Sequence, residues 1–231
     1  MQLDETINQI IKRMGYKIYL EIGTNFGNTF NNINCDKMIA VEPKISNMEY
    51  GEIKTLRNEN YAFYRMTSDD FFNKFNESVD IVFIDGLHEY MQALRDVINS
   101  LKIINHGGIV LVHDVDPKDE IEALTDDEFF NGFMKKNPDY TGGWTGDVWK
   151  TILHIRSLWD DIHVQTFDIK YGLSVIIKGR FQNRLPYGHA TIQSMTFDDF
   201  KKKRQEILNI RKYEDIMEDI MHQPILKRFE E

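Results

Sequence analysis

The sequence predicts an α/β fold in which a doubly wound sheet of seven strands is mostly parallel and ends in one antiparallel strand. Short apolar segments alternate with segments of helical periodicity, which is typical of βαβ units. The last two apolar segments are separated by three residues, too few for a parallel crossover, so they should form an antiparallel hairpin. We assign this domain to residues 1–180 and a C-terminal helical extension to residues 181–231.

The individual elements follow in order along the chain. The first is a helix, because Ile7, Ile10 and Met14 recur at helical spacing and Gly15 follows as an end signal. The clearest later helix has its apolar positions between residues 91 and 104. The predicted strands cover residues 17–22, 37–41, 61–66, 79–84, 109–113, 163–169 and 173–177.

An acidic and aromatic segment interrupts this alternation after the fifth strand, and a glycine-rich segment follows it. A loop of this length is usually a functional lid or an insertion, and we assign it to residues 117–146. Its aromatic residues could close over a site and stack on a sugar or a planar acceptor, or they could form a satellite core. These are Phe129, Phe130, Phe133, Tyr140 and Trp144, with Trp149 just beyond.

The extension contains a long helix candidate over residues 196–222, which begins with a capping-box-like sequence at Thr196. Its apolar stripe, from Phe200 to Ile220, is too narrow for an independent core. The helix should therefore dock on the main domain or on a second copy of the chain, and we expect a homodimer.

Composition excludes several classes of function. The formal charge of −9 repels nucleic acid and anionic membrane surfaces, so neither is an expected partner. The single cysteine, Cys35, cannot pair within the chain, which favours a reducing compartment. The first residues do not resemble a signal peptide, and the longest apolar runs are too short to span a bilayer. A cytoplasmic protein with a small-molecule ligand is the expectation.

The end of the first strand carries the first candidate binding residues. Glu21, Gly23 and Gly27 lie in a tight turn that should lead into a helix, at the sheet edge where α/β proteins bind ligands. The dinucleotide fingerprint G-x-G-x-x-G is absent, because Asn25 and Asn28 stand at its second and third glycine positions. An acidic residue just before the turn suits a positively charged ligand better than a pyrophosphate.

The next two strand ends add polar residues to the same edge. Glu42 ends the second strand and can accept hydrogen bonds from both hydroxyls of a ribose. Thr67, Ser68 and Asp69 follow the third strand and could contact an adenine ring, although Ser68 or Asp69 could instead cap the next helix.

Together these motifs resemble the ordered series of class I S-adenosylmethionine-dependent methyltransferases, which have a Rossmann-like sheet with an antiparallel seventh strand. The series continues with residues 79–86 and 107–110. The resemblance covers about residues 16–180 and implies S-adenosylmethionine as cofactor. The implied cofactor residues are Glu21, Gly23, Thr24, Asn25 and Gly27 for the methionine part, Glu42 for the ribose, Thr67, Ser68 and Asp69 near the adenine, and Asp85.

Residues 83–90 and 112–114 are similar to the macrocin and catechol-type branch of small-molecule O-methyltransferases. That resemblance implies a divalent cation, most simply Mg²⁺, on Asp85 and Asp114. His88 stands where that branch has a lysine base, and Val115 where it has an asparagine ligand. His113 or Asp116 could supply the missing ligand.

Two catalytic variants therefore remain open. In one, Asp85 and Asp114 bind Mg²⁺ beside the acceptor; in the other, His88 removes the acceptor's proton without a metal. Each residue also has a structural interpretation: Asp85 as a helix N-cap, His88 as a surface residue and His113 as a buried donor.

The predicted function is methyl transfer to a hydroxyl of a small metabolite, most plausibly a sugar or a sugar nucleotide. The alternatives are an NAD-dependent oxidoreductase on a related sheet and a non-catalytic binding protein with the same fold. The missing dinucleotide fingerprint and the terminal hairpin disfavour the oxidoreductase.

Overall fold

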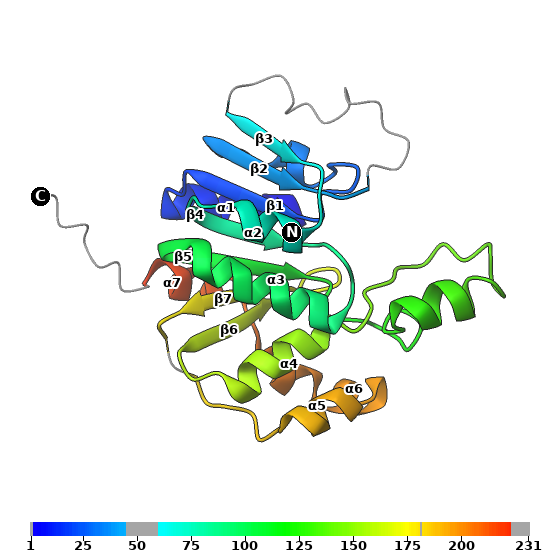
Figure 1. The fold of residues 1–231 in the computed structure, drawn as a ribbon. Helices are drawn as coiled ribbons and strands as arrows, with labels where there is room; N and C mark the ends of the chain where they lie inside the picture. Colours follow the sequence, from blue (N-terminus) through cyan, green and yellow to red (C-terminus); the bar gives the residue numbers. More distant parts are fainter. Residues whose placement is uncertain (1, 45–59, 181, 223–231) are drawn as a thin grey trace, which may run out of the picture.

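The computed structural model describes residues 2–44, 60–180 and 182–222, and a central sheet dominates it (Figure 1). The strands stand in the order β3-β2-β1-β4-β5-β7-β6-β8. Their bounds are β1 Ile18–Ile22, β2 Lys37–Val41, β3 Tyr61–Tyr64, β4 Val79–Ile84, β5 Ile104–His113, β6 Ile162–Phe167, β7 Leu173–Lys178 and β8 Ile210–Arg211. The strands β1 to β5 pair in parallel and β7 runs antiparallel to β5 and β6, which confirms the predicted class.

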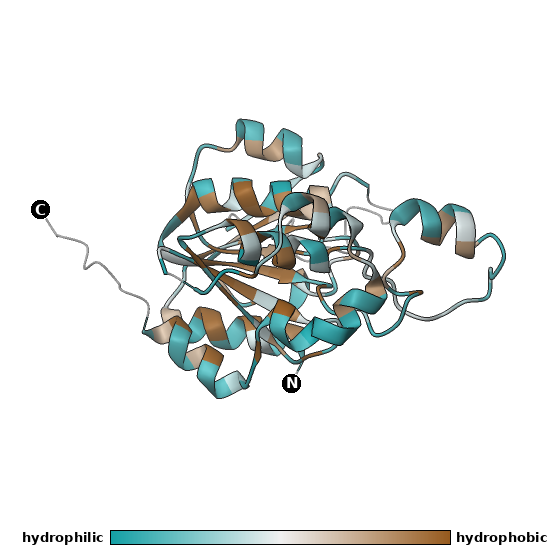
Figure 2. Cartoon of the chain, turned by 90° about the horizontal axis from the view of Figure 1, so that it is seen from below, coloured by the Kyte–Doolittle hydropathy of each residue, from teal (hydrophilic) through white to brown (hydrophobic). Residues whose placement is uncertain are grey.

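Helices cover both faces of this sheet. The α-helices are α1 Leu3–Met14, α2 Ser68–Lys74, α3 Tyr90–Ile103, α4 Trp149–Leu158, α5 His189–Ser194, α6 Phe197–Leu208 and α7 Tyr213–Met221. Helices α2 to α6 pack on one face, and α1 and α7 pack on the other. Strand β4 serves both cores, because Val82 and Ile84 face the first while Ile81 and Phe83 face the second. Figure 2 shows the resulting layer of apolar strands between the helices.

Within the described residues the sheet has eight strands, so the predicted count of seven is wrong. The predicted helix over 196–222 is broken at Asn209, which has a left-handed backbone and donates a hydrogen bond from its side chain to the Val164 carbonyl. The two residues that follow form β8, parallel to the end of β6. Asparagine tolerates this backbone conformation better than most residues, which explains how the helix ends there.

The apolar stripe of the extension is covered by the chain itself. Phe200 and Ile207 of α6 lie fully buried in the core of one face, and Met217 and Ile220 of α7 lie buried in the core of the other. The homodimer was predicted because this stripe needed a covering surface, and the chain itself provides one. The homodimer stays a prediction. None of the helices in the described part of the chain is long and apolar enough to cross a membrane.

The structure differs from the sequence prediction at two places near the site. The turn after β1 leads into a single 3-10 turn, η1 Phe30–Asn32, where the sequence predicts a full helix. The turn therefore offers a ligand little helix dipole, and side chains and backbone amides must provide the contacts. Strand β5 begins five residues before the predicted start, with a register irregularity opposite Val79–Ile81.

Candidate active site

A cleft with a volume of about 810 Å³ opens along the carboxyl ends of the parallel strands. Ligands bind at this edge in open α/β sheets. The cleft brings together most of the residues predicted from the sequence, namely Glu21, Gly23, Thr24, Asn25, Glu42, Thr67, Ser68, Asp69, Asp85, His88, His113 and Asp114. Gly27 and Asp116, also predicted, are not among the residues that line it.

Gly23 lets the first turn lie directly against the end of β4. Its φ is +86°, and a Cβ atom there would lie 2.2 Å from the Asp85 carbonyl oxygen. No side chain fits at that distance. Gly27, which also has a positive φ, donates its N–H to the Thr24 carbonyl at 2.7 Å and so closes the turn without lining the cleft.

Two polar side chains of this turn are buried at the floor of the cleft. Glu21 is 1% exposed and accepts a hydrogen bond from the Tyr19 hydroxyl. Burial raises the pKa of Glu21 well above its ordinary value, more than that hydrogen bond lowers it. The hydroxyl of Thr24 is buried without a hydrogen-bond partner in the described part of the chain. A buried polar atom without a partner points to a ligand.

Glu42 is held in one orientation by backbone groups. One carboxylate oxygen accepts the Asn25 N–H and the other accepts the Lys44 N–H, both at 2.9 Å. A carboxylate has about four acceptor positions, so Glu42 can still bind two hydroxyls. Asn25, with a φ of +45°, turns its amide toward Glu42 and joins the first two strand ends.

The third strand end meets helix α3, a contact that the sequence does not predict. Thr67, rather than Ser68 or Asp69, caps helix α2, because its hydroxyl accepts the Asp70 N–H at 3.1 Å. The Gln92 amide donates to Ser68 at 3.1 Å and to Asp96 at 3.0 Å.

Asp96 lines the cleft although it is 1% exposed. Burial raises the pKa of Asp96 to about 6. The apolar periodicity of residues 91–104 places Gln92 and Asp96 on the opposite, polar face of the helix, so no signal in the sequence pointed to them.

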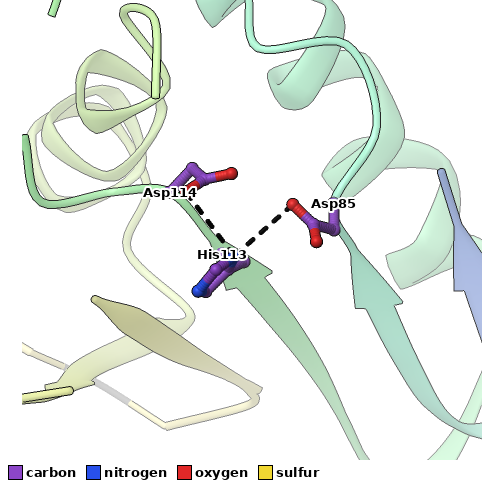
Figure 3. Close-up of side chains that lie close together, drawn as sticks. All are labelled: Asp85, His113 and Asp114. Carbon is purple, nitrogen blue, oxygen red and sulfur yellow. Dashed lines mark ion pairs between the residues drawn. The ribbon is translucent and has the colours of Figure 1, made fainter. Parts of the chain in front are cut away.

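A compact group of acids and imidazoles lies at the ends of β4 and β5 (Figure 3). His113 Nδ1 lies 3.4 Å from Asp85 Oδ1 and 3.6 Å from Asp114 Oδ1. Burial lowers the pKa of His113, but the two carboxylates outweigh it and hold that pKa well above its ordinary value. Burial likewise raises the pKa of Asp85, and His113 and His88 reverse that effect, holding it well below its ordinary value.

His88, which lies in the loop before α3, is the fourth member of this group. Its Nε2 lies 3.0 Å from Asp114 Oδ2, and its Nδ1 lies 3.0 Å from the carbonyl oxygen of Trp144. Burial lowers the pKa of His88, but the hydrogen bonds to Asp114 and Asp85 outweigh it and raise that pKa to about 10. Both ring nitrogens thus face hydrogen-bond acceptors, and the ring donates a hydrogen bond from each of them.

His113 and Asp116 differ as candidate ligands. His113 Nε2 lies 3.2 Å from the Lys170 carbonyl oxygen, which accepts a hydrogen bond from that nitrogen, so that Nδ1 faces the carboxylates. Asp116 turns away, because both of its oxygens are bonded to Arg204. Val115 is fully buried in the core and offers no ligand. The structure therefore groups Asp85, His113 and Asp114, each with one candidate ligand atom within 4.8 Å of the others.

The 117–146 segment projects from the sheet body beside these strand ends (Figure 1). It contains a π-helical segment, η3 Asp127–Phe133. Trp144 stacks on Phe129 with ring centroids 5.2 Å apart, and its ring lies 4.9 Å from that of His88. We call Phe129, Phe130, Phe133, Tyr140 and Trp144 the aromatic cluster.

The second end of this segment is anchored to helix α3. Asp147 accepts the Tyr90 N–H at 2.7 Å, so it caps α3 and not the helix α4 that follows it in sequence. Gly146 is equally constrained, because a Cβ atom there would lie 1.8 Å from the His88 carbonyl oxygen. The aromatic cluster is thus tied directly to the loop that carries His88.

Comparison with known proteins gives one family match and several solved structures of similar fold. Residues 20–115 match the family model of a methyltransferase domain. The fold is similar to that of a putative caffeoyl-CoA O-methyltransferase from Staphylococcus aureus (16% identity, 76% of this chain and 82% of the other covered, TM-score 0.53). It is also similar to TomG of Streptomyces achromogenes, an O-methyltransferase solved with SAM (15%, 77% and 79%, 0.51), and to a Bacillus cereus O-methyltransferase solved with SAH (12%, 77% and 82%, 0.51).

At these identities the solved structures establish a shared fold, and no curated protein matches the sequence. The family match covers residues 20–115, and the solved structures add a likeness in fold to O-methyltransferases, two of them solved with SAM or SAH.

Proposed function

We propose that this chain transfers a methyl group from S-adenosylmethionine to a hydroxyl oxygen of a small metabolite, a sugar or a sugar nucleotide. The observation that carries the proposal is the meeting of Asp85, His88 and Asp114 in the same cleft as the Gly23 turn. Proton-transfer groups and a cofactor cradle thus share one cleft.

The cleft fits the cofactor in shape and in chemistry. Gly23 removes the side chain where the turn meets β4, and the unpartnered Thr24 hydroxyl and the Glu21 carboxyl face the space that opens there. These residues would bind the methionine part, Glu42 the ribose hydroxyls, and Ser68 with its partner Gln92 the adenine edge. When bound, S-adenosylmethionine supplies an electrophilic methyl group on a positively charged sulfur.

The chain's own residues must orient the acceptor and remove its proton. Displacement at the methyl carbon requires an oxygen nucleophile in line with the sulfur, so positioning and a base provide much of the rate. The carboxylates of Asp85 and Asp114 lie at this point of the cleft. His88 already donates toward Asp114 and the Trp144 carbonyl, and it would hold the carboxylate and the aromatic cluster in place.

Asp85, His113 and Asp114 form a set that fits a divalent cation. His113 Nδ1 is buried without a hydrogen-bond partner in the described residues, and the Lys170 carbonyl orients the ring as outer contacts orient metal-bound histidines. A cation there would lower the pKa of the acceptor hydroxyl. Mg²⁺ prefers all-oxygen ligands, whereas an imidazole also suits softer ions such as Mn²⁺.

The 117–146 segment would act as the lid over the acceptor. Its support is the contact between Trp144 and His88, through both the ring and the carbonyl group. Phe130 is 47% exposed and so remains open to a ligand. Aromatic faces of this kind can pack on a sugar ring and exclude water from the reacting atoms.

Titration with S-adenosylhomocysteine by calorimetry tests the cofactor. We expect micromolar binding, and Glu42→Ala should weaken it by about 1 to 3 kcal/mol, the scale of lost buried polar contacts. The control is Glu77→Ala, which removes a carboxylate paired with Lys37 at the start of β2 and should leave binding unchanged. Binding of NAD without binding of S-adenosylhomocysteine would contradict the proposal.

Titration with Mn²⁺, followed by electron paramagnetic resonance, separates the two catalytic variants. If the metal-assisted form is correct, the wild type binds Mn²⁺ and Asp114→Ala binds it at least tenfold more weakly. A chelator should then abolish turnover while S-adenosylhomocysteine still binds. Chelator-resistant turnover, with a loss of about 10²- to 10⁴-fold in His88→Ala, would instead identify His88 as the base.

A further inference from the structure

A second cavity, of about 480 Å³, lies next to the active-site cleft. Its walls come from the chain that follows Asp114, from the turn between β6 and β7, and from α6. Tyr171 lines both cavities. The two spaces therefore meet at one side chain, so that a ligand larger than a single ring could reach from one to the other.

Three lysines from three separate segments line this cavity: Lys118, Lys170 and Lys201. The two acids in its wall, Asp116 and Asp168, are both bonded to Arg204. None of the three lysines forms an ion pair within residues 2–44, 60–180 and 182–222. The cavity thus carries a net positive charge in a chain whose formal charge is −9.

Two of these ammonium groups lie beside the same aromatic ring. The Nζ atoms of Lys118 and Lys170 lie 5.7 Å and 4.6 Å from the centre of the Tyr171 ring. Contact with an aromatic ring stabilises each cation modestly but leaves its positive charge uncompensated. An anion bound in the cavity would compensate these charges.

The remainder of the wall is apolar. Phe200 is fully buried and Phe197 is partly buried at the base of α6. A ligand with an anionic end and an uncharged ring or chain would therefore meet complementary surface here. The Tyr171 ring would lie between its two parts.

We propose that the second cavity binds a phosphate or diphosphate group of the acceptor, whose hydroxyl reaches Asp85 and Asp114 past Tyr171. The inference rests on the proposed function, because it assigns the other end of the same acceptor. Lysines bind phosphate as point charges, whereas a carboxylate is best bound by the paired donors of an arginine. Arg204 is already bonded to Asp116, so the free cations favour phosphate.

Calorimetric titration with inorganic pyrophosphate tests the cavity directly. The wild type should bind it, and the double variant Lys118→Gln/Lys170→Gln should bind at least about tenfold more weakly, as expected for lost charge-assisted hydrogen bonds. The matched control is Lys202→Gln, since Lys202 lies beside Lys201 on α6 but does not line the cavity. It should change the affinity less than twofold.

A second titration distinguishes a phosphate carried by the acceptor from free phosphate. Glucose 1-phosphate should bind more tightly than inorganic phosphate, and Trp144→Ala should weaken only the sugar phosphate. Equal affinities, or equal effects of Trp144→Ala, would overturn the assignment to the acceptor.

The outcomes for this cavity and for the proposed function are separable. Binding of S-adenosylhomocysteine by every variant shows that the fold and the cofactor cleft are intact. If S-adenosylhomocysteine binds but pyrophosphate does not, or if the control Lys202→Gln weakens pyrophosphate as much as the double variant, the cavity is not a phosphate site. Failure to bind S-adenosylhomocysteine would overturn the proposed function instead.

Discussion

The two sides of the cleft are built in different ways. The cofactor side follows consecutive strand ends: Glu21 lies near the end of β1, Glu42 directly follows β2, and Ser68 begins the helix after β3. Backbone amides hold the turn and Glu42 in place. The acceptor side is assembled from segments far apart in the chain. His88 meets Trp144 across 56 residues, and Arg204 meets Asp116 across 88 residues.

This difference predicts different responses to substitution. Where the backbone itself forms the site, a single added atom should be severe, because the neighbouring backbone has nowhere to move. Where side chains form the site, the loss of one contact should be modest and local.

The largest effect is expected at Gly23. Gly23→Ala places a methyl group 2.2 Å from the Asp85 carbonyl oxygen, at a left-handed backbone position. The end of β1 or of β4 must move, which should cost at least about 3 kcal/mol of unfolding free energy. It should also weaken S-adenosylhomocysteine binding. Chemical denaturation and calorimetry measure the two effects.

Gly107→Ala is the matched control for Gly23→Ala. Gly107 also has a positive φ, but a Cβ atom there meets nothing within 4 Å. Only the backbone strain remains, which costs about 1 to 2 kcal/mol. Equal losses in the two variants would show that strain alone, and not the contact with β4, makes Gly23 necessary.

The cofactor side was predictable because it depends on local order. A parallel strand followed by a turn places its next residues at one sheet edge, so Glu21, Glu42 and Ser68 could be grouped from the sequence alone. Tyr171 and Arg204 could not. The hairpin that carries Tyr171 was predicted, but its packing against Asp116 was not, and Arg204 lies on a helix whose docking surface the periodicity left open. The 3-10 turn after β1 and the strand β8 were missed for the same reason, since tertiary contacts override local periodicity.

A smaller effect, dependent on pH, is expected at Asp96. Burial raises the pKa of Asp96 to about 6 in the folded chain, against about 3.9 in an unfolded chain. The folded state therefore binds a proton that the unfolded state has released. The resulting stabilisation is complete below about pH 4 and is lost as the pH rises through about 6.

The comparison for Asp96 is with Asp96→Asn, which cannot ionise. The unfolding free energy of the wild type, relative to Asp96→Asn, should fall by about 1 to 3 kcal/mol between about pH 4 and pH 8. Urea denaturation at several pH values measures it. Parallel curves for the two proteins would show that the side chain is better solvated than its 1% exposure indicates.

The smallest effect is expected on the acceptor side, at the pair that separates Asp116 from the candidate cation ligands. Asp116→Asn removes the charge that binds Arg204 through both carboxylate oxygens. Because the Arg204 side chain is 37% exposed, water replaces part of the lost interaction, and the cost should be about 1 kcal/mol.

Asp168→Asn is the control: Asp168 binds the same guanidinium at 3.2 Å but is 71% exposed, so its loss should cost about 0.5 kcal/mol or less. Both variants should bind S-adenosylhomocysteine as the wild type does, since neither residue lines the cofactor cleft. A loss of cofactor binding in Asp116→Asn, without one in Asp168→Asn, would show that the two sides of the cleft are coupled through the chain from Asp114 to Asp116.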